Sequence, residues 1–510
     1  MDRRTRIDYL LVISVFAVSL AGIFTLYTQE VIIENSEGRW VKQLVFFLMG
    51  VVLALFVRRF NYTLLGSYAV PLFAIAMLLL VITLVPFIGT KVKGARSWLR
   101  VGDFGFQTSE LAKLAYIILM AKYLELKERD IERIPSLFLP FMLTLLPMVL
   151  IVIQPDLGGA VALMPILMTM LFIAGADILH IGSVLMFFGV SISIPLYIEY
   201  YRITLVDPLI DHLSDLGQDS LIPAVRILRS DVWNFLEKSV IPAGIEENDL
   251  SYLQRVMGNA GLMGNFREAA NSVRSDAGGL LLQLLDNEFW MIILGGVLVV
   301  VSVVLFVVRF TQGGLVDYLR KIYIPTGVLG MSILAAMAVH MTFSFKYHQV
   351  ARVTAFINPD KFPRDLAYQT RASKAAIGSG QLTGRGMFQG DMTMGERPLV
   401  PEAQTDFIFT SWSERTGFIG SFLILILLLI IPLRALQLSF EARDRFGSFL
   451  AAGFAAMFFF HTFLNAGIAL GLMPVTGLPL SFMSYGGSHM ITNMAAVGIL
   501  LSIYRRKHAN

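Results

Sequence analysis

Long apolar segments alternate with short polar segments along nearly the whole chain. A helix needs about 17 to 25 predominantly apolar residues to cross a bilayer, and about twelve segments meet or approach this length. They lie at about 9–28, 43–57, 63–86, 109–125, 136–153, 160–175, 181–199, 289–308, 322–342, 416–433, 448–471 and 488–504. The pattern predicts an all-α polytopic membrane protein with about twelve transmembrane helices.

Composition agrees with this prediction and excludes several other classes of protein. The 510 residues are 56% hydrophobic, which is too apolar for a soluble globular fold. The formal charge of +4 comes from short basic clusters between apolar segments, so we interpret it as membrane topology and expect no nucleic-acid partner. Cysteine is absent, which excludes disulfides, thiolate metal sites and cysteine nucleophiles. The basic start and long apolar run of the N-terminus predict a first transmembrane helix rather than a cleaved signal.

The basic clusters also predict the orientation in the membrane. With twelve spans they all fall on one side, which should be the cytoplasm. They are Arg3, Arg4 and Arg6; Arg58 and Arg59; Lys127, Arg129 and Arg133; Arg309, Arg320 and Lys321; Arg434, Arg443 and Arg445; and Arg505, Arg506 and Lys507. We therefore expect a multi-pass protein of the cytoplasmic membrane with both termini in the cytoplasm.

Three longer polar stretches then lie outside, at 87–108, 200–288 and 343–415. The first and third carry basic residues against the topology rule, and such a concentration favours an anion site, for example for a pyrophosphate. The alternative is that long loops cross the membrane regardless of charge. These basic residues are Lys91, Lys93, Arg96 and Arg100 in the first stretch, and Lys346, Arg352, Lys361, Arg364, Arg371, Lys374, Arg385 and Arg397 in the third.

Asp406 is the main candidate for chemistry. It stands between a polar loop and an apolar helix in the segment PLVPEAQTDFIFTSWSERTGFIG, on the predicted outer side. An acid held at that boundary is costly, so it marks a candidate functional site. The alternative is that Asp406 caps a short interfacial helix that precedes the tenth span.

A glycine-rich loop and a charged pair are further candidates. The glycines of SKAAIGSGQLTGRGMFQG permit tight turns and close approach of the main chain to a ligand, although the loop lacks the spacing of a Walker motif. Glu110 and Lys113, three residues apart, can share a helix face, either as part of a site or as a structural ion pair.

The sequence leaves the roles of two more features open. Asp156 of QPDLGG follows a proline, where a cap or turn is as good an interpretation as a site. The Pro- and Gly-rich segment 471–489 predicts a broken re-entrant stretch, which membranes tolerate only where protein or a polar cavity surrounds it. The histidines show no metal-ligand spacing, so we interpret them as packing or hydrogen-bonding residues; they include His340, His348, His461 and His489.

In this order, five stretches resemble the SEDS family (shape, elongation, division and sporulation), and its rod-shape branch more than its division branch. The stretches are KGARSWLRVGDFGFQTSELAKL, QPDLGGA, the run from Tyr347 through IGSGQLTGRG to VPEAQTDFIF, SERTGFIGS, and GLMPVTGLPLSFMSYGGS. The resemblance implies a ten-helix membrane core that polymerises the peptidoglycan precursor lipid II outside the cytoplasmic membrane. It also implies a class B penicillin-binding protein as partner, together with membrane proteins of the elongation machinery.

The resemblance further implies that Asp406 is the catalytic carboxylate and that the charged residues and glycines line a polar cavity. The expected substrate- and pyrophosphate-binding residues are Arg352, Lys374, Arg96, Lys113, Glu110, Gly378, Gly380, Gly384 and Gly386. We assign supporting roles to Asp156, Glu402, Glu414, Ser484, Gly486 and Gly487. The sequence departs from the family pattern at Ser97, Thr108, Arg415 and His489.

The resemblance covers most of the chain outside residues 181–308. We therefore expect a first core part at 1–180, an inserted transmembrane hairpin at 181–308 that carries the outer loop 200–288, and a second core part at 309–510 with the catalytic loop 343–415. The amphipathic segments of the inserted loop are expected to lie on the outer leaflet or to contact the partner.

The chemistry expected of such a site is an inverting glycosyl transfer. Asp406 would act as general base on the acceptor hydroxyl, and cationic side chains would stabilise the departing pyrophosphate. The sequence indicates no certain cofactor, and it leaves open whether a divalent cation shares the task with Asp406, Glu402 or Asp391 as ligands. The competing interpretations are a flippase or transporter of the lipid-linked precursor, a scaffold without activity, and the division-type paralogue.

Overall fold

The structure is a computed structural model that describes residues 7–31, 38–86, 88–92, 95–101, 104–127, 134–154, 156–228, 231–238, 241, 245, 247–277, 285, 287–311, 316–342, 356–357, 366–394 and 398–507. The chain divides into two compact units. One is formed by Met1–Ile178 with Phe362–Asn510, and the other by Leu179–Lys361.

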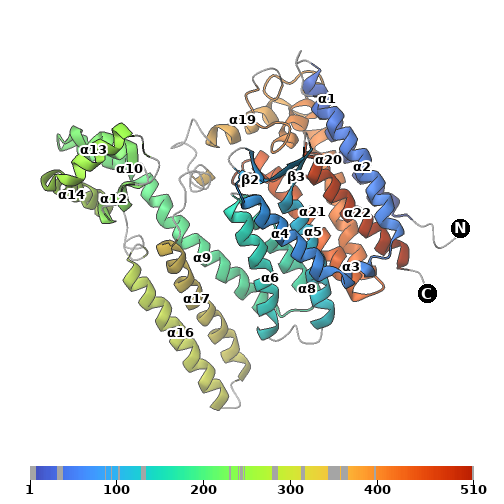
Figure 1. The fold of residues 1–510 in the computed structure, drawn as a ribbon, viewed down its shortest axis with the longest axis horizontal. Helices are drawn as coiled ribbons and strands as arrows, with labels where there is room; N and C mark the ends of the chain where they lie inside the picture. Colours follow the sequence, from blue (N-terminus) through green and yellow to red (C-terminus); the bar gives the residue numbers. More distant parts are fainter. Residues whose placement is uncertain are drawn as a thin grey trace. The chain divides into compact units, whose positions relative to one another are not determined.

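The described residues of the first unit form mainly helices, together with a small sheet and irregular segments (Figure 1). Its elements are α1 (Tyr9–Glu30), α2 (Arg39–Arg59), α3 (Thr63–Ser67), α4 (Ala69–Leu84), β1 (Gly89–Val92), β2 (Ala95–Val101), β3 (Phe104–Gln107), α5 (Thr108–Lys127), α6 (Ile134–Ile153), α7 (Leu157–Val161), α8 (Leu163–Ile173), α19 (Leu366–Ser379), α20 (Ile408–Glu441), α21 (Arg445–Ala469) and α22 (Gly487–Arg506).

The helices confirm the predicted all-α membrane architecture. Eight of the described helices are long and apolar enough to cross a membrane, and three shorter apolar helices accompany them. α5 does not meet the same criterion, because Glu110, Lys113, Lys122 and Glu125 interrupt its apolar run. The number of twelve crossings stays a prediction.

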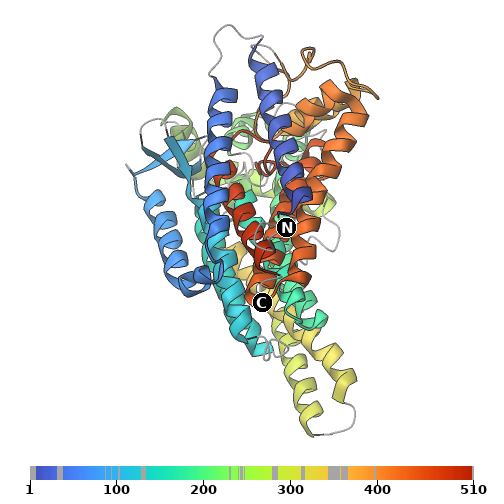
Figure 2. The same ribbon diagram turned by 90° about the vertical axis from the view of Figure 1, so that its right-hand side faces the viewer.

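α21 is the central helix of this unit. It packs against α5, α8 and α20, and 83% of its membrane-length stretch is buried. Small residues permit this close packing: a side chain at Gly453 would place its Cβ only 2.6 Å from Ile117 Cγ2 and 3.0 Å from Met170 Sδ. α22 is enclosed to a similar extent and packs along α2, which runs beside α1 (Figure 2). The most rigidly held side chains of the unit therefore come from α21 and α22.

A three-stranded antiparallel sheet precedes α5, where the sequence predicted only a loop. β2 pairs with both neighbours, with Trp98 opposite Thr90 on one side and Gln107 on the other. The strands are short, so they lack a long alternation that sequence analysis could detect. Two departures from the family pattern meet here, since Ser97 and Thr108 are buried and Thr108 Oγ1 donates to Ser97 O at 3.5 Å. The sheet leads directly into the first turn of α5 and so fixes where Glu110 lies.

α20 contains a kink at Gly417, whose φ of 65° and ψ of −163° are not helical. The kink frees main-chain groups, and the glycine-rich loop bonds to them. Phe418 N and Ile419 N donate to Gln381 O and Leu382 O, at 2.7 and 3.1 Å. In return, the carbonyls of residues 414 and 415 accept from the amides of residues 385 and 386. The main-chain groups freed by the kink are thus satisfied by the glycine-rich loop.

The loop can approach only because glycines stand at the contact. A Cβ at Gly380 would lie 2.4 Å from Ser413 O, and a Cβ at Gly384 would lie 1.9 Å from Arg415 O. Gly378 and Gly386 differ, since a Cβ at Gly378 would meet nothing within 4 Å and one at Gly386 only Gln389 Oε1 at 3.9 Å. Gly380 and Gly384 therefore have a structural reason to be glycine, whereas their predicted contact with substrate stays a prediction.

The second unit contains two groups of helices besides α9 (Ile178–Thr204). The first group is α10 (Val206–Asp215), η3 (Asp219–Leu221), α11 (Ile222–Leu228), α12 (Val232–Lys238), α13 (Glu247–Gly258) and α14 (Ala260–Ala277). These helices share a hydrophobic core that includes Leu209, Phe235 and Phe266 (Figure 1). Their amphipathic pattern is explained by this core without a membrane surface, and the expected contact with a partner stays a prediction.

The second group is a hairpin of α16 (Glu288–Thr311) and α17 (Val316–Thr342). The two helices approach closely at glycines: a Cβ at Gly330 would lie 2.7 Å from Gly295 O, and one at Gly327 would lie 2.4 Å from Ser302 Oγ. The predicted insertion boundaries, 181–308, fall inside this unit and stay a prediction.

The two glycines Gly378 and Gly380 provide a matched test of the loop contact. We expect Gly380→Ala to lower the free energy of unfolding by about 1–3 kcal/mol, because its methyl group overlaps the main chain of α20. Gly378→Ala should not lower it, because the site is open and alanine favours the helix. Thermal denaturation midpoints of the two variants in detergent measure the difference. Equal midpoints would contradict the role of the close approach.

Candidate active site

Asp406 closes a tight turn that leads into α20. The turn spans residues 401–407, and Glu402 adopts a φ of 56° within it. Glu402 O accepts from Thr405 N and Phe407 N at 3.0 and 3.2 Å, which folds the turn on itself. Phe407 is fully buried with Val400 and Ala403, so it anchors the end of the turn. Phe407, and not Asp406, is the N-cap residue of α20.

Three other parts of the chain hold the main chain of this turn. Asn465 Nδ2 of α21 donates to Asp406 O at 2.8 Å and to Leu478 O at 2.9 Å. Ser484 Oγ donates to Thr405 O at 2.6 Å. From α1, Gln29 Nε2 donates to Ser411 Oγ at 2.9 Å, and that hydroxyl donates to Ala403 O at 3.0 Å. The position of Asp406 is therefore set by hydrogen bonds to the main chain of its turn.

The segment 471–486 runs beside the carboxylate. Gly477 has a φ of +76°, and a Cβ at this position would lie 3.8 Å from Asp406 Oδ2. The same segment passes Lys374, whose Cε would lie 2.0 Å from a Cβ at Gly471. On α2, Gln43 binds the segment further along, with Nε2 donating to Ser484 O at 3.0 Å and Oε1 accepting from Gly486 N at 3.1 Å. This irregular segment, predicted as re-entrant, thus lines the site and is held by side chains of rigid helices.

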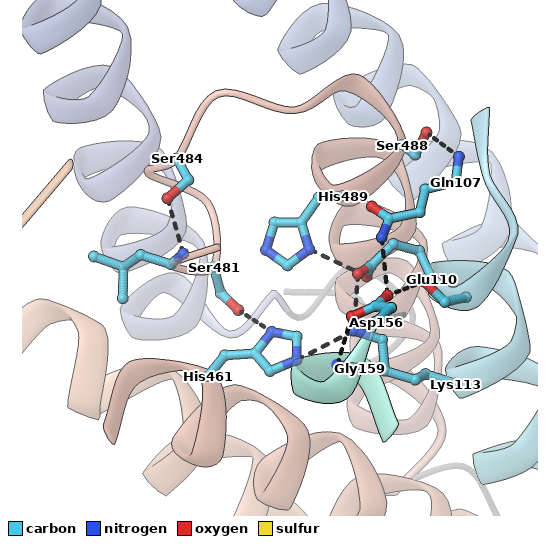
Figure 3. Close-up of polar contacts among 12 residues, drawn as sticks. Gln107, Glu110, Lys113, Asp156, Gly159, His461, Ser481, Ser484, Ser488 and His489 are labelled. Atoms are coloured by element: carbon cyan, nitrogen blue, oxygen red, sulfur yellow. Dashed lines mark hydrogen bonds and ion pairs between the residues drawn. The ribbon is translucent and has the colours of Figure 1, made fainter. Parts of the chain in front are cut away.

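A buried charged network contacts that segment through Ser481 (Figure 3). Lys113 Nζ pairs with Glu110 Oε1 at 2.8 Å, and both side chains are almost completely buried. A different histidine contacts each member of the pair. His489 Nδ1 lies 3.1 Å from Glu110 Oε2, and His461 Nε2 lies 3.3 Å from Lys113 Nζ. Together they join α5, α21 and α22 inside the first unit.

The donors and acceptors of this network can be assigned from chemistry. An ammonium group only donates, so His461 Nε2 accepts and the ring carries its hydrogen on Nδ1, which donates to Ser481 Oγ at 3.3 Å. A carboxylate only accepts, so His489 Nδ1 donates to Glu110. His489 Nε2 is buried and has no hydrogen-bond partner in the described part of the protein.

Asp156 acts as a helix cap. Its carboxylate accepts from Gly159 N at 2.9 Å at the start of α7, and also from Gln107 Nε2 and Ser109 Oγ at 3.1 and 2.9 Å. These contacts tie α7 to the end of β3 and the first turn of α5 (Figure 3). Of the two interpretations left open by the sequence, the geometry gives the cap.

Glu414 and Arg415 are adjacent in α20 and bind different parts of the chain. Glu414 accepts from Met392 N, Thr393 N and Thr393 Oγ1 at 3.0, 3.1 and 2.6 Å, so it anchors the end of the glycine-rich loop. Arg415 is buried, and its Nη1 donates to Thr25 O and Thr28 Oγ1 of α1. The departure from the family pattern at Arg415 therefore connects α20 to α1.

Among the described residues, the two predicted pyrophosphate-binding lysines lie in different surroundings. Lys113 is buried in the network, and Lys374 is exposed beside Gly471. Arg352 and the side chain of Arg96 lie outside the described residues. Gly487 is buried against Phe46.

The carboxylates named as alternative cation ligands have other partners. Glu402 accepts from Thr405 Oγ1 at 3.1 Å, and Asp391 pairs with Arg385. Among the residues that the structure describes, no three His, Asp or Glu side chains are grouped to hold a metal ion.

The sequence predicts no particular role for Gln29, Asn465 and Ser481, and for His461 it predicts only packing or hydrogen bonding. Their importance depends on which segments meet in space. Polar residues inside apolar helices were the one available signal, since such residues are rare in a membrane and usually face the bundle interior.

Comparison with known proteins identifies the family. The family described as "Cell cycle protein", which comprises FtsW, RodA and SpoVE, matches residues 6–221 and 291–509. The chain belongs to this family. The resemblance to the SEDS family is thereby confirmed, and the unmatched residues 222–290 include α11, α12, α13 and α14.

Relatives in this family carry both elongation and division names. The peptidoglycan glycosyltransferase RodA of Treponema pallidum is 31% identical over 505 residues, with 98% of each chain covered. A probable peptidoglycan glycosyltransferase FtsW of Trichlorobacter lovleyi is 27% identical, with 98% of this chain and 94% of the relative covered.

Solved structures share the SEDS fold. A chain of a peptidoglycan synthase complex aligns with a TM-score of 0.58 at 22% identity, covering 99% of this chain and 100% of its own. The rod shape determining protein RodA of Thermus thermophilus aligns with a TM-score of 0.51 at 21% identity, covering 99% of each chain.

The buried ion pair gives a prediction for this SEDS protein. Glu110→Gln or Lys113→Met alone leaves one buried charge without its counter-charge, and we expect each to lower stability by about 3–5 kcal/mol. The double variant removes both charges, so its stability should not fall below that of the less stable single variant. Denaturation midpoints in detergent measure the three variants. Losses that simply add in the double variant would mean that the two charges do not stabilise each other.

Proposed function

We propose that this chain is a peptidoglycan glycosyltransferase that polymerises lipid II, with Asp406 as the general base of an inverting transfer. Membership in the SEDS family and the names of its relatives support the glycosyltransferase activity. The observation that carries the assignment of Asp406 is its geometry. A carboxylate stands at the start of a membrane helix, on a turn whose main chain is held by α1, α21 and the segment 471–486.

The proposed step is a single displacement at an anomeric carbon. Lipid II links its sugar to pyrophosphate by an α bond, and the polymer bond is β, so one inversion is sufficient. Asp406 takes the proton of the acceptor 4-hydroxyl as its oxygen bonds to C1 of the donor, and the bond from C1 to the pyrophosphate oxygen breaks. General-base assistance of this kind contributes on the order of 10²- to 10⁴-fold.

Cations near the donor would stabilise the leaving pyrophosphate. Lys374 is exposed beside the same segment that borders Asp406, which supports a direct role for it. Arg352 and Arg96 are proposed for the same task from the sequence, with arginine suited to bidentate phosphate contact. Lys113 is committed to Glu110 and His461, so we assign it to organising the site rather than to contact with the leaving group.

We place the site on the extracytoplasmic face of the cytoplasmic membrane, with both termini in the cytoplasm. Basic residues support this orientation, because several interact at the end of the bundle opposite Asp406. Arg434 pairs with Asp8 at 2.8 Å, Arg506 Nη1 donates to Phe60 O at 2.8 Å, and Lys507 pairs with Glu441 at 2.6 Å. Such clustering of basic residues marks the cytoplasmic side.

The proposed partner is a class B penicillin-binding protein, within the elongation machinery. Similarity to one chain of a synthase complex that coordinates polymerisation and crosslinking supports a partner of this kind. The elongation role is supported by the similarity to RodA, and the division role of FtsW is the alternative.

The decisive experiment supplies labelled lipid II in detergent to the purified chain with its partner. We expect glycan ladders from the wild type, and at least a 100-fold loss in Asp406→Asn. This substitution isolates the carboxylate, because Asn465 and Ser484 bind only the main chain of the turn. Asp211→Asn, at an exposed position in α10, is the matched control.

Ladders that Asp406→Asn leaves unchanged would remove Asp406 from the chemistry. Movement of lipid II across vesicles without any polymer would instead favour a carrier.

A further inference from the structure

His461 contacts both the buried ion pair and the segment beside Asp406. On one side its Nε2 accepts from Lys113, and on the other its Nδ1 donates to Ser481, each at 3.3 Å. The side chain is completely buried. Nothing in the proposed displacement uses this residue, yet its two ring nitrogens connect different parts of the site.

The path from His461 continues to Asp406 through the turn at residues 480–484. Ser484 Oγ accepts from Leu480 N at 2.8 Å, which holds the residues around Ser481 in a compact turn. The same hydroxyl donates to Thr405 O, directly before Asp406. A displacement of Ser481 would therefore reach the main chain of the Asp406 turn through one further hydrogen bond.

α21 provides a second, parallel connection. His461 and Asn465 are four residues apart and so lie on the same face of this helix. Asn465 binds Asp406 O and Leu478 O, so it ties the turn to the segment 471–486. One face of α21 thus contacts the ion pair through His461 and the turn at Asp406 through Asn465.

We propose that His461 is a positioning residue for Asp406, an inference that rests on the proposed function. It fixes the segment 471–486 against the Glu110–Lys113 pair, and that segment in turn borders the carboxylate at Gly477. The ring suits this role because it accepts at one end and donates at the other, so its orientation between Lys113 and Ser481 is unique. Misplacement of a reacting group by about 1 Å can cost about 100-fold in rate.

The test compares His461→Leu with His461→Gln in the lipid II assay with the partner present. Leucine removes both hydrogen bonds, whereas glutamine can accept from Lys113 through its carbonyl and donate to Ser481 through its amide. We expect His461→Leu to lower kcat by about 10- to 100-fold with KM changed less than about threefold, and His461→Gln to retain most of kcat. The pH dependence of kcat/KM should keep its wild-type shape in His461→Gln, because His461 transfers no proton.

Ser481→Ala is the second variant. It removes the hydrogen bond from His461 Nδ1 and leaves Lys113 paired with Glu110. We expect it to lower kcat in the same way, and it decides the question if His461→Leu does not fold. Phe463→Leu, on the exposed face of the same helix, is the control for substitutions in α21. Denaturation midpoints of all variants separate lost positioning from lost stability.

Wild-type kcat in His461→Leu or in Ser481→Ala overturns the inference. So does an equal loss in the leucine and glutamine variants, or a shifted pH profile in His461→Gln. Wild type and Asp406→Asn are assayed in parallel. Absence of polymer from the wild type removes the proposed function and this inference together, whereas a normal wild type, an inactive Asp406→Asn and an unaffected His461→Leu remove only the inference.

Discussion

Hydrogen bonds to the main chain of residues 403–406 are the constraint on which the site depends. The turn is folded by its own hydrogen bonds to Glu402 O, and contacts from other elements fix where it lies in the bundle. Asn465 of α21, Ser484 of the segment 471–486 and Gln29 of α1 each donate to a carbonyl of the turn. Each such bond contributes only about 0.5–1.5 kcal/mol net. Their value lies in geometry, because three bonds from separate elements fix the position of the turn.

The residues that provide these bonds must themselves be fixed, which explains the buried charges nearby. A Glu–Lys pair inside a membrane bundle is costly and contributes little net stability on its own. Here it acts as a common contact for α5, α21 and α22, through His461 and His489. Some buried polar atoms near it have no partner among the described residues, including His489 Nε2 and both amide atoms of Asn493.

The sequence predicted the parts of this arrangement that depend on local pattern. Hydropathy located the helices, and the three-residue spacing of Glu110 and Lys113 correctly indicated that they share a face. The position of Asp406 between a polar loop and an apolar helix is a local signal too, and it was sufficient to mark this residue as a candidate. What could not be predicted depends on tertiary proximity. The glycine-rich loop was interpreted as a ligand loop, yet Gly380 and Gly384 pack on the main chain of α20 at a kink that no local signal reveals. The sheet before α5 was too short to detect, and His461 and Asn465 gain their meaning only from the segments that α21 contacts.

Three irregular segments lie against this frame of helices, and hydrogen bonds to the protein stabilise each of them. Residues 380–394, 401–407 and 471–486 have main-chain groups that no regular helix or strand satisfies. Each segment bonds instead to a helix or to another of the three: the first to the kink of α20, the second to α21, and the third to α2 through Gln43. Asp406 lies on the second of these segments and beside the third, and Lys374 of α19 is exposed beside the third. The fold thus combines enclosed helices, which supply stability, with irregular segments, which supply the geometry that a glycosyl transfer requires.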